Sequence, residues 1–440
     1  MKPETFYIFT LGCAKNEFDS YRLSRKLAAF GFRQVDVPEG ADLVILNTCT
    51  FIEDAVYETV EVAHSLKKRI KEGQKFIVAG CAVNYFREKI NRLVEANLYL
   101  STASMQNPEK IIKGSGGEIC LGDKEKIESP QDFETAQEKK PSAYLKVAEG
   151  CSNRCSYCLI PKIRGPLKSI PVEICVAEAE RLVKSGVKEL NLIAQDLSSY
   201  GVDLYGRPYL KELTDLIHKK LSNFDFWLRL MYLNPDKADF DMLGEILDME
   251  KVVPYLELPV QSGSQKVLEK MNRKRKPEFI LENLEKLKKT FPELVIRTTF
   301  LVGFPGETED DFEATVCLMK EMRPDYVYVF GYSDMEGSAS FGFEGKLKAE
   351  EIKERVNYLS ELAYKMMEEK AIEKEGLEVR VLVENRCEGG VCGRAYFQAP
   401  EIDGEIFLDR KVALGSFVAV RLKSAIGLDF EGEVINNDAQ

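Results

Sequence analysis

The stretch EGCSNRCSYC, residues 149–158, places three cysteines in the spacing C-x3-C-x2-C. It follows YLKVA at residues 144–148, an apolar run that predicts a β-strand ended by Gly150. The strand therefore delivers the thiols to one loop at its carboxyl end. Three thiolates on so short a loop can hold three corners of an iron–sulfur cubane and leave the fourth iron open to another ligand. These thiols belong to Cys151, Cys155 and Cys158.

Two other interpretations of this loop remain. A structural zinc ion takes four protein ligands, and no histidine lies nearby, so Cys175 would have to supply the fourth. The second alternative is three cysteines of a hydrophobic core, but a loop rich in Ser, Asn and Arg does not fit a core.

The spacing of the cysteines, with Tyr157 directly before the last of them, resembles the signature of the radical S-adenosylmethionine enzymes. The resemblance implies a 4Fe-4S cluster whose open iron chelates the amine and carboxylate of S-adenosylmethionine. Reductive cleavage of that molecule would then give a 5'-deoxyadenosyl radical. In such enzymes the cofactor supplies the difficult chemistry, and the protein supplies position and insulation.

A second group of cysteines occupies equivalent positions in the first part of the chain. Apolar runs at 6–10, 43–46 and 76–79 predict parallel strands, with helices from about residues 19 and 53 between them. One cysteine follows each strand: Cys13, Cys49 and Cys81. Parallel strands end at one edge of a sheet, so the three thiols should converge there. We expect a second iron–sulfur cluster, because three unrelated buried cysteines would not share this position.

From residue 144 onward, strands and amphipathic helices alternate six times. The helical pattern is clear at 172–185 and 277–290. Such units predict an open, partial version of the eightfold barrel, with the site at the carboxyl ends of the strands. Cys175 and Cys317 fall within helices and are expected in the core. The candidate strands are 144–148, 189–194, 227–232, 255–260, 295–302 and 326–332.

The last part of the chain changes character. A charged helix is predicted at 349–374, and the short β runs after it, separated by Gly and acidic residues, predict a small β-barrel. Cys387 and Cys392 flank a Gly-Gly pair, where we expect a hairpin with two free thiols rather than a third metal site. The β runs are 379–383, 391–394, 406–408 and 417–422.

The length of 440 residues allows three domains, which we place at 1–125, 137–372 and 373–440 in an α/β fold. Residues 114–141 are predicted to be a linker, in which Cys120 is incidental. The 11 cysteines, without an export signal or a membrane span, favour thiolates and metal over disulfides and indicate a cytoplasmic protein. Only two histidines are present, which argues against Ser-His-Asp or Cys-His catalysis. The net charge of −11 disfavours broad nucleic-acid binding and suits a basic partner.

Polar residues and glycines follow several barrel strands and are candidates for contacts to S-adenosylmethionine. A Gln-Asp pair after the second strand can bind its amino group, and a Gln-Ser pair after the fourth can reach ribose hydroxyls. A glycine-rich turn after the fifth strand can pair with adenine, although Thr308 in that turn is also a plausible helix cap. The candidates are Tyr157, Gln195, Asp196, Gln261, Ser262, Thr299 and Gly303.

With both cysteine groups, nearly the whole chain resembles the methylthiotransferases, a family of radical S-adenosylmethionine enzymes. The resemblance implies an N-terminal domain whose second 4Fe-4S cluster holds or donates sulfur, and a C-terminal TRAM domain. It also implies that one S-adenosylmethionine methylates the sulfur and a second starts the radical step. The matching segments are LGCAKN at 11–16, NTC at 47–49, GC at 80–81, GR at 393–394 and APEIDG at 399–404.

Within this family, the chain is most similar to the enzymes that methylthiolate the β-carbon of an aspartate in ribosomal protein uS12. A transfer-RNA adenosine is the alternative substrate, because residues 261–264 resemble the transfer-RNA enzymes. A two-cluster electron carrier or iron sensor is a non-enzymatic alternative, but it would need no nucleoside pocket. The segments similar to the uS12 enzymes are 51–52, 200–205, 229–232 and 332–338.

The expected partners are uS12, free or in the small ribosomal subunit, and an electron donor. From Glu373 to the C-terminus there are 13 Asp and Glu against 8 Lys and Arg. An acidic domain suits a basic ribosomal protein better than a transfer RNA. We therefore expect Glu401, Asp403 and Glu405 to bind uS12, and the basic run at 266–276 to be a solvated helix end.

Overall fold

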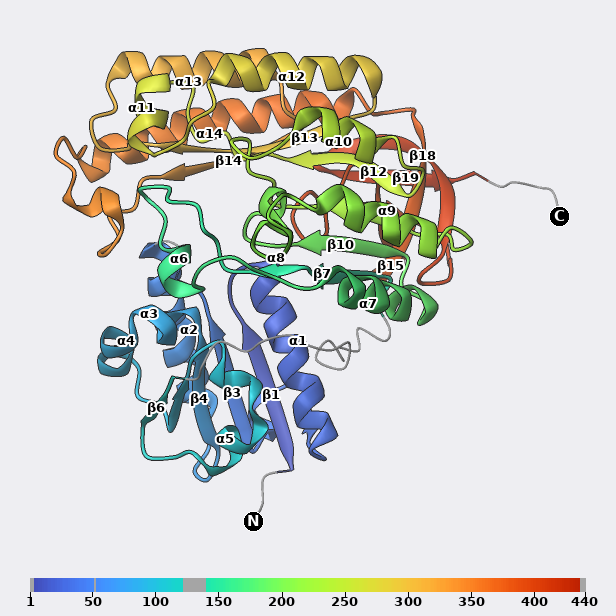
Figure 1. The fold of residues 1–440 in the computed structure, drawn as a ribbon. Coiled ribbons are helices and arrows are strands. Elements are labelled where there is room, and N and C mark those ends of the chain that lie inside the picture. The colour runs from blue at the N-terminus through green and yellow to red at the C-terminus, as the bar shows by residue number, and fades with distance from the viewer. Residues whose placement is uncertain (1–3, 51–52, 122–139, 436–440) are drawn as a thin grey trace.

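The computed structural model describes residues 4–50, 53–121 and 140–435, and its main strands form three separate β-structures in chain order (Figure 1). The first two are parallel six-stranded sheets, and the third is a closed barrel of five strands. This arrangement confirms the predicted fold class. Within these described ranges, every helix is too short or too polar to cross a membrane.

The N-terminal sheet is buried on both faces. Its strand order is β2 (Arg33–Gln34), β1 (Thr5–Thr10), β3 (Leu43–Thr48), β4 (Lys75–Gly80), β5 (Leu98–Leu100) and β6 (Glu118–Cys120). The helices around it are α1 (Ala14–Ala29), α2 (Glu53–Arg69), α3 (Cys81–Tyr85), α4 (Arg87–Leu93) and α5 (Pro108–Lys113). Val44 of β3 packs in the core that includes α2, whereas Ile45 packs in the core that includes α1. Alternate side chains along each strand thus fill two cores, which explains the unbroken apolar runs.

Two features of this domain differ from expectation. Helix α1 begins at Ala14 rather than near residue 19, so Cys13 directly precedes a helix. The linker prediction for 114–141 is wrong at Glu118–Cys120, which pairs with β5 as an edge strand, and residues 122–139 lie outside the described residues. A strand of three residues is too short to show a reliable period in sequence.

The middle sheet is the predicted partial barrel, and each strand pairs with the next along the chain. The strands are β7 (Ser142–Lys146), β10 (Glu189–Ile193), β11 (Trp227–Leu230), β12 (Val252–Glu257), β13 (Val295–Val302) and β14 (Tyr326–Gly331). Its larger helices are α7 (Val172–Lys184), α9 (Leu210–Lys220), α10 (Phe240–Leu247), α12 (Pro277–Thr290), α13 (Glu309–Met322) and α14 (Ala349–Ile372). Cys175 is buried, as expected, but the core prediction for Cys317 is wrong. Cys317 is exposed because it shares a face of α13 with the exposed Glu313 and Lys320.

The C-terminal barrel contains one strand more than predicted. Its strands are β15 (Glu378–Cys387), β16 (Gly390–Ala395), β17 (Ile406–Leu408), β18 (Phe417–Ile426) and β19 (Asp429–Val434). The pattern does not reveal β19, because half of the residues in its sequence DFEGEV are acidic. The prediction of two free thiols in the β15–β16 hairpin is also wrong, since Cys387 and Cys392 form a disulfide. Their Cα atoms are 5.9 Å apart, within the range of a disulfide, and no thiolate is left there for a metal.

The two smaller domains cover opposite ends of the middle domain. In Figure 1, the blue N-terminal strands lie near α6 (Ile160–Ile163), on the side toward which the β10 arrow points, and the red C-terminal strands lie at the other end. Leu159, Ile163 and Met335 of the middle domain share one apolar core with Leu11 and Val83 of the N-terminal domain. Packing therefore holds the N-terminal domain against the carboxyl ends of the barrel strands.

Buried ion pairs attach the C-terminal barrel to the middle domain. Arg394 pairs with Glu189, the first residue of β10. Asp403 is fully buried, pairs with Arg297, and accepts a hydrogen bond from the Tyr255 hydroxyl at 2.6 Å. The expectation that Asp403 binds a protein partner is therefore wrong, because its charge is used inside the fold.

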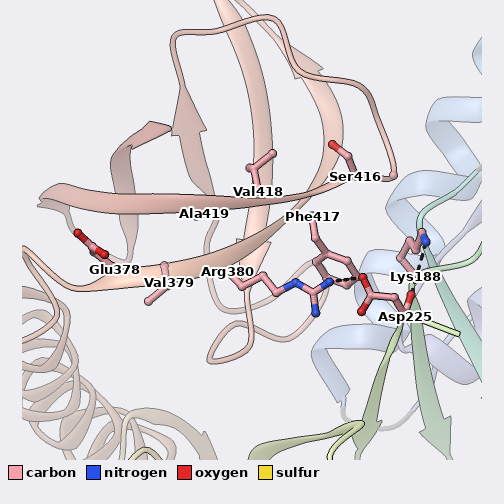
Figure 2. A pocket seen from close by; sticks show the side chains of 10 residues that line it. Lys188, Asp225, Glu378, Val379, Arg380, Ser416, Phe417, Val418 and Ala419 are labelled. Carbon is pink, nitrogen blue, oxygen red and sulfur yellow. Dashed lines mark hydrogen bonds and ion pairs between the residues drawn. The ribbon is translucent and has the colours of Figure 1, made fainter. Parts of the chain in front are cut away.

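A cleft of about 660 Å³ lies where these two domains meet (Figure 2). Figure 2 shows Arg380 extending along Phe417, 3.7 Å from the ring centroid, to pair with Asp225. Lys188 and Asp225 line the cleft, one residue before β10 and two residues before β11 respectively. The cleft is thus at the amino ends of the strands, away from the cysteines, where a barrel enzyme does not carry its chemistry.

Candidate active site

The loop of Cys151, Cys155 and Cys158 leaves a short strand, β8 (Ala148–Glu149), through Gly150. Gly150 has a φ of +74°, and a Cβ there would overlap the carbonyl oxygen of Pro166, so only glycine fits. Strand β8 pairs with β9 (Lys168–Ser169), which closes the loop from the other side. Cys151 is buried, and the other two cysteines are half-buried. The three thiols lie just past the carboxyl end of β7, as the spacing predicts.

The thiols of this loop are close enough to influence one another. Burial raises the pKa of Cys151 to about 11 and the pKa of Cys158 to about 12, and the neighbouring thiols add to both shifts. At neutral pH they are therefore protonated unless a metal replaces the protons.

The spacing of the sulfur atoms distinguishes an iron–sulfur cluster site from a zinc site. Among the described residues, neither cysteine group has all three sulfurs within 4.8 Å of one another, whereas a tetrahedral zinc site would hold them about 3.8 Å apart. A cubane binds each thiolate at a different iron and spaces them more widely. Cys175 also does not supply a fourth ligand, because its Sγ lies 3.7 Å from the Ile170 carbonyl and 3.8 Å from the Tyr200 hydroxyl. The loop fits an iron–sulfur cluster and does not fit zinc.

Cys13, Cys49 and Cys81 meet at the carboxyl edge of the N-terminal sheet. Cys13 precedes α1, Cys49 follows β3, and Cys81 begins α3. Gly12, with a φ of +99°, brings the first loop against the second, and an added Cβ would lie only 2.8 Å from Cys49 Sγ. Burial raises the pKa of Cys81 to about 12, the nearby guanidinium of Arg164 opposes this shift, and the two other thiols add to it. These thiols therefore come together at one place, as the sequence predicts.

Arg164 connects the two cysteine sites. Its Nη2 donates to Asn16 Oδ1 at 2.5 Å, and the same oxygen lies 3.6 Å from Cys81 Sγ. Its Nη1 reaches Glu149 Oε1 at 3.4 Å, two residues before Cys151. A continuous path of contacts therefore runs from one cysteine loop to the other across the domain boundary.

The charged side chains that adjoin this path form ion pairs with one another. Burial would raise the pKa of Glu149, but Lys146 and Arg164 outweigh it and lower the pKa to about 2. Asp19 accepts from Lys146 at 3.0 Å and from Arg164 at 2.6 Å. Glu149 is thus ionised, and ion pairs of this kind hold the two domains in one register.

Gln195 and Asp196 lie beside the loop of Cys151, where the sequence predicts contacts to S-adenosylmethionine. Gln195 Nε2 donates to Glu149 at 3.0 Å, and Asn153 Nδ2 of the cysteine loop donates to Asp196 at 2.7 Å. Gln195 Oε1 and Asp196 Oδ1 are buried and have no hydrogen-bond partner among the described residues. Two orphaned acceptors suit the ammonium group of a ligand at this place.

The other predicted cofactor residues take different positions. Thr299 shares a face of β13 with Arg297, whose side chain points into the barrel, so Thr299 points there as well. Gln261 has a φ of +73° and pairs by its backbone with β13. The Ser262 hydroxyl bonds Thr315 of α13 at 3.2 Å, and Gly303 packs against Ile352 of α14. Their roles toward S-adenosylmethionine remain predictions.

Arg273 holds the side chain of Tyr157 in place. The sequence pattern predicts that Arg273 lies on the surface. Arg273 Nη1 donates to the Tyr157 hydroxyl at 3.3 Å, and Nη2 donates to the Pro259 carbonyl at 2.9 Å. Arg273 also pairs with Asp236 and is only 7% exposed. The prediction of a solvated helix end at 266–276 is therefore wrong at Arg273, because the cysteine loop covers its guanidinium.

Three further residues, Lys15, Tyr232 and Glu257, contact one another where the N-terminal domain meets the barrel, and none was predicted as a site residue. Lys15 Nζ lies 3.0 Å from the centroid of the Tyr232 ring, although the two residues belong to different domains. The backbone N–H of Tyr232 donates to Glu257 Oε2 at 3.0 Å. Burial lowers the pKa of Lys15 and raises the pKa of Glu257. The available signals were the segments 11–16 and 229–232, which resemble the family and contain Lys15 and Tyr232.

Models of three known families match the chain. The radical SAM superfamily matches residues 145–319, an uncharacterized family, UPF0004, matches residues 5–101, and the TRAM domain matches residues 376–435. A solved structure shares this fold: the radical S-adenosylmethionine methyltransferase TsrM of Kitasatospora setae, with cobalamin and a 4Fe-4S cluster bound. Its TM-score is 0.52 at 13% identity, over 75% of each chain.

Two relatives align with this chain over nearly their whole length. The ribosomal protein uS12 methylthiotransferase RimO of Thermosipho africanus is 37% identical over 434 residues, 98% of this chain and 99% of the relative. The protein of the same name from Thermoanaerobacter sp. strain X514 is 38% identical over 443 residues, 97% of this chain and 99% of the relative.

Proposed function

This chain belongs to the RimO family of radical SAM methylthiotransferases, and on that premise we propose that it methylthiolates the β-carbon of an aspartate in ribosomal protein uS12. The observation that carries the proposal is the contact path from Cys81 through Asn16 and Arg164 to Glu149, beside Cys151. It places two cysteine triads on either side of one domain boundary. An enzyme that must join sulfur to a carbon radical needs both sites in reach of one substrate residue.

The residues fit two 4Fe-4S clusters and S-adenosylmethionine. Cys151, Cys155 and Cys158 would hold one cluster, and the second triad, Cys13, Cys49 and Cys81, would hold the other. When bound, these groups would supply the reductive cleavage of S-adenosylmethionine and the sulfur to be transferred. An external electron donor is required, and because the substrate is a ribosomal protein, we place the reaction in the cytoplasm.

The surrounding side chains would bind S-adenosylmethionine and orient the cysteine loop. Gln195 and Asp196 offer their two unpaired oxygens to the amino group of S-adenosylmethionine. Arg273 holds Tyr157 in place directly before Cys158, and Arg164 holds the N-terminal domain closed over the loop.

Transfer RNA is not favoured as substrate, because the basic run at 266–276 is largely engaged within the protein. Lys266 pairs with Asp311 at 2.8 Å, and Arg275 lies over the Phe279 ring at 4.4 Å. Arg273 is buried. Side chains with these partners contribute little to phosphate binding, which requires free cations.

The proposal is tested by separating radical generation from sulfur transfer. In anaerobically reconstituted enzyme with a reductant and uS12, Cys49→Ala should still cleave S-adenosylmethionine but form no methylthio product. Cys151→Ala should lose both reactions, and Cys317→Ala, on the outer face of α13, should retain both. If Cys49→Ala still methylthiolated uS12 at the normal rate, the two-site arrangement would be wrong.

A further inference from the structure

Lys15 is an unusual buried cation in this fold. Its side chain is 7% exposed, and its Nζ lies over the Tyr232 ring, 3.0 Å from the centroid. Nine Lys and Arg side chains are buried in the described part of the chain, and Lys15 is the one that makes neither a hydrogen bond nor an ion pair there. Burial of an ammonium group without a counter-ion is costly, so its retention calls for an anionic ligand.

Besides the Cys13 thiol, two carboxylates act electrostatically on Lys15, and both already have other partners. Glu257 accepts from the Tyr232 backbone at 3.0 Å, and its other oxygen faces Arg297 Nε at 3.6 Å. Glu149 is held by Lys146 at 2.7 Å and by Arg164. Neither carboxylate comes within ion-pair distance of Lys15, so no side chain of the described residues pairs with the ammonium.

The position of Lys15 coincides with the place where the reacting residue must lie. It follows Cys13 by two residues in the N-terminal domain, and it touches Tyr232, which follows β11 at the carboxyl rim of the barrel. The substrate residue has to reach both cysteine sites, and Lys15 is within electrostatic reach of Cys13 at one site and of Glu149 beside the other. The aromatic ring occupies one side of the ammonium, which leaves other N–H donors for a second partner.

We infer that the Lys15 ammonium, stacked on Tyr232, is the receptor for the carboxylate of the acidic residue that this enzyme modifies. This inference rests on the proposed function and deepens it. A carboxylate would complete the charge balance of the site, whereas an amide or a nucleobase would leave the cation unpaired. Lys15 would therefore select an acidic side chain over its neutral isostere and hold it with the β-carbon near both cysteine sites.

The test compares binding of two forms of uS12 to reconstituted holoenzyme. One form carries the target aspartate, and the other carries asparagine at that position. Without reductant but with S-adenosylmethionine present, the wild-type enzyme should bind the aspartate form at least about tenfold more tightly. In Lys15→Met, binding of the aspartate form should weaken roughly 10- to 100-fold, and the preference should fall below about twofold. Lys288→Met, a half-buried lysine on the outer helix α12, should keep the wild-type preference.

A second pair of variants tests the ring. Tyr232→Leu should lose most of the preference, whereas Tyr232→Phe, which keeps the aromatic face, should retain it. Iron content and cluster spectra are measured for every variant. An unchanged preference in Lys15→Met, or loss of iron from the N-terminal site in that variant, would overturn the inference. Failure of the proposed function would give a different result: the wild-type enzyme with reductant would leave uS12 unmodified.

Discussion

Arg164 Nη2 donates to Asn16 Oδ1 at 2.5 Å, and this single hydrogen bond joins residues of two domains at the centre of the enzyme. Asn16 lies in the helix that begins directly after Cys13, and Arg164 lies six residues beyond Cys158. Each cysteine loop is therefore positioned relative to the other through a fixed guanidinium group. The distance over which sulfur transfer must occur depends on this contact.

Replacing Arg164 by Gln should destabilise the protein and uncouple the two sites. The change removes one of the two cations that pair with the buried Asp19 in the described part of the chain, and it should cost about 3 kcal/mol. Cleavage of S-adenosylmethionine should persist, with methylthiolation reduced at least about tenfold. Chemical denaturation and product analysis measure the two effects, and Lys184→Met, in an exposed pair with Glu180, is the control that should change neither. Equal loss of both reactions would contradict a positioning role.

The two cysteine triads should bind separate clusters. Reconstituted wild-type protein should hold about eight irons per chain if both clusters contain four. The triple variant with Ala at Cys151, Cys155 and Cys158 should retain about half of that iron. Full iron content in the triple variant would show that these thiols are not ligands.

Gly12→Ala should damage the N-terminal site alone. The new Cβ would lie 2.7 Å from Cys49 Cβ and 2.8 Å from its Sγ, at a backbone φ of +99° that disfavours alanine. Iron content should fall toward half, and methylthiolation should be lost, while cleavage of S-adenosylmethionine continues. Gly31→Ala is the matched control, because that glycine also has a positive φ but no atom lies within 4 Å of the added Cβ. Normal iron content in Gly12→Ala would argue against the close approach of the two loops.

Glu189 should make the stability of the protein depend on pH. Burial would raise its pKa, but Arg394 and Arg229 outweigh it and lower the pKa from 4.5 to about 2. A lowered folded-state pKa stabilises the protein above pH 4.5, and this contribution is lost as the pH falls from about 4.5 toward 2. Between pH 6 and pH 3.5, this group alone should account for a loss on the order of 1 kcal/mol in the free energy of unfolding.

The check on this prediction is urea unfolding of wild type and Glu189→Gln at both pH values. The variant should be less stable at pH 6, because Arg394 and Arg229 lose their shared partner, and its pH dependence should be smaller. An identical pH dependence in both proteins would rule out an ionised Glu189 in the folded state.

Much of the architecture follows from local sequence. The apolar runs predict most strands, since a strand buried on both faces needs unbroken hydrophobic residues, as in Leu43–Thr48. The cysteines could be assigned to strand ends for the same reason. The short strand β6 and the acidic strand β19 could not be predicted from sequence. Their pairing partners, rather than their own residues, make them strands.

The parts of the site that escaped prediction all join residues far apart in the chain. Lys15 meets Tyr232, Asn16 meets Arg164, and Asp403 meets Arg297 only after whole domains dock. No periodicity within one segment reports such contacts. Composition alone also misled, because the acidic count of the C-terminal barrel includes Asp403, whose charge is neutralised inside the fold.

The identity of the substrate is tested most directly by finding which molecule receives the methylthio group, uS12 or transfer RNA. Reconstituted enzyme, reductant and S-adenosylmethionine would be incubated with uS12 and unmodified transfer RNA together, and both products would be analysed by mass spectrometry. We predict that one aspartate of uS12 gains a methylthio group in place of a hydrogen, while transfer RNA stays unmodified. A methylthio group on a transfer-RNA adenosine, with uS12 unchanged, would contradict the account.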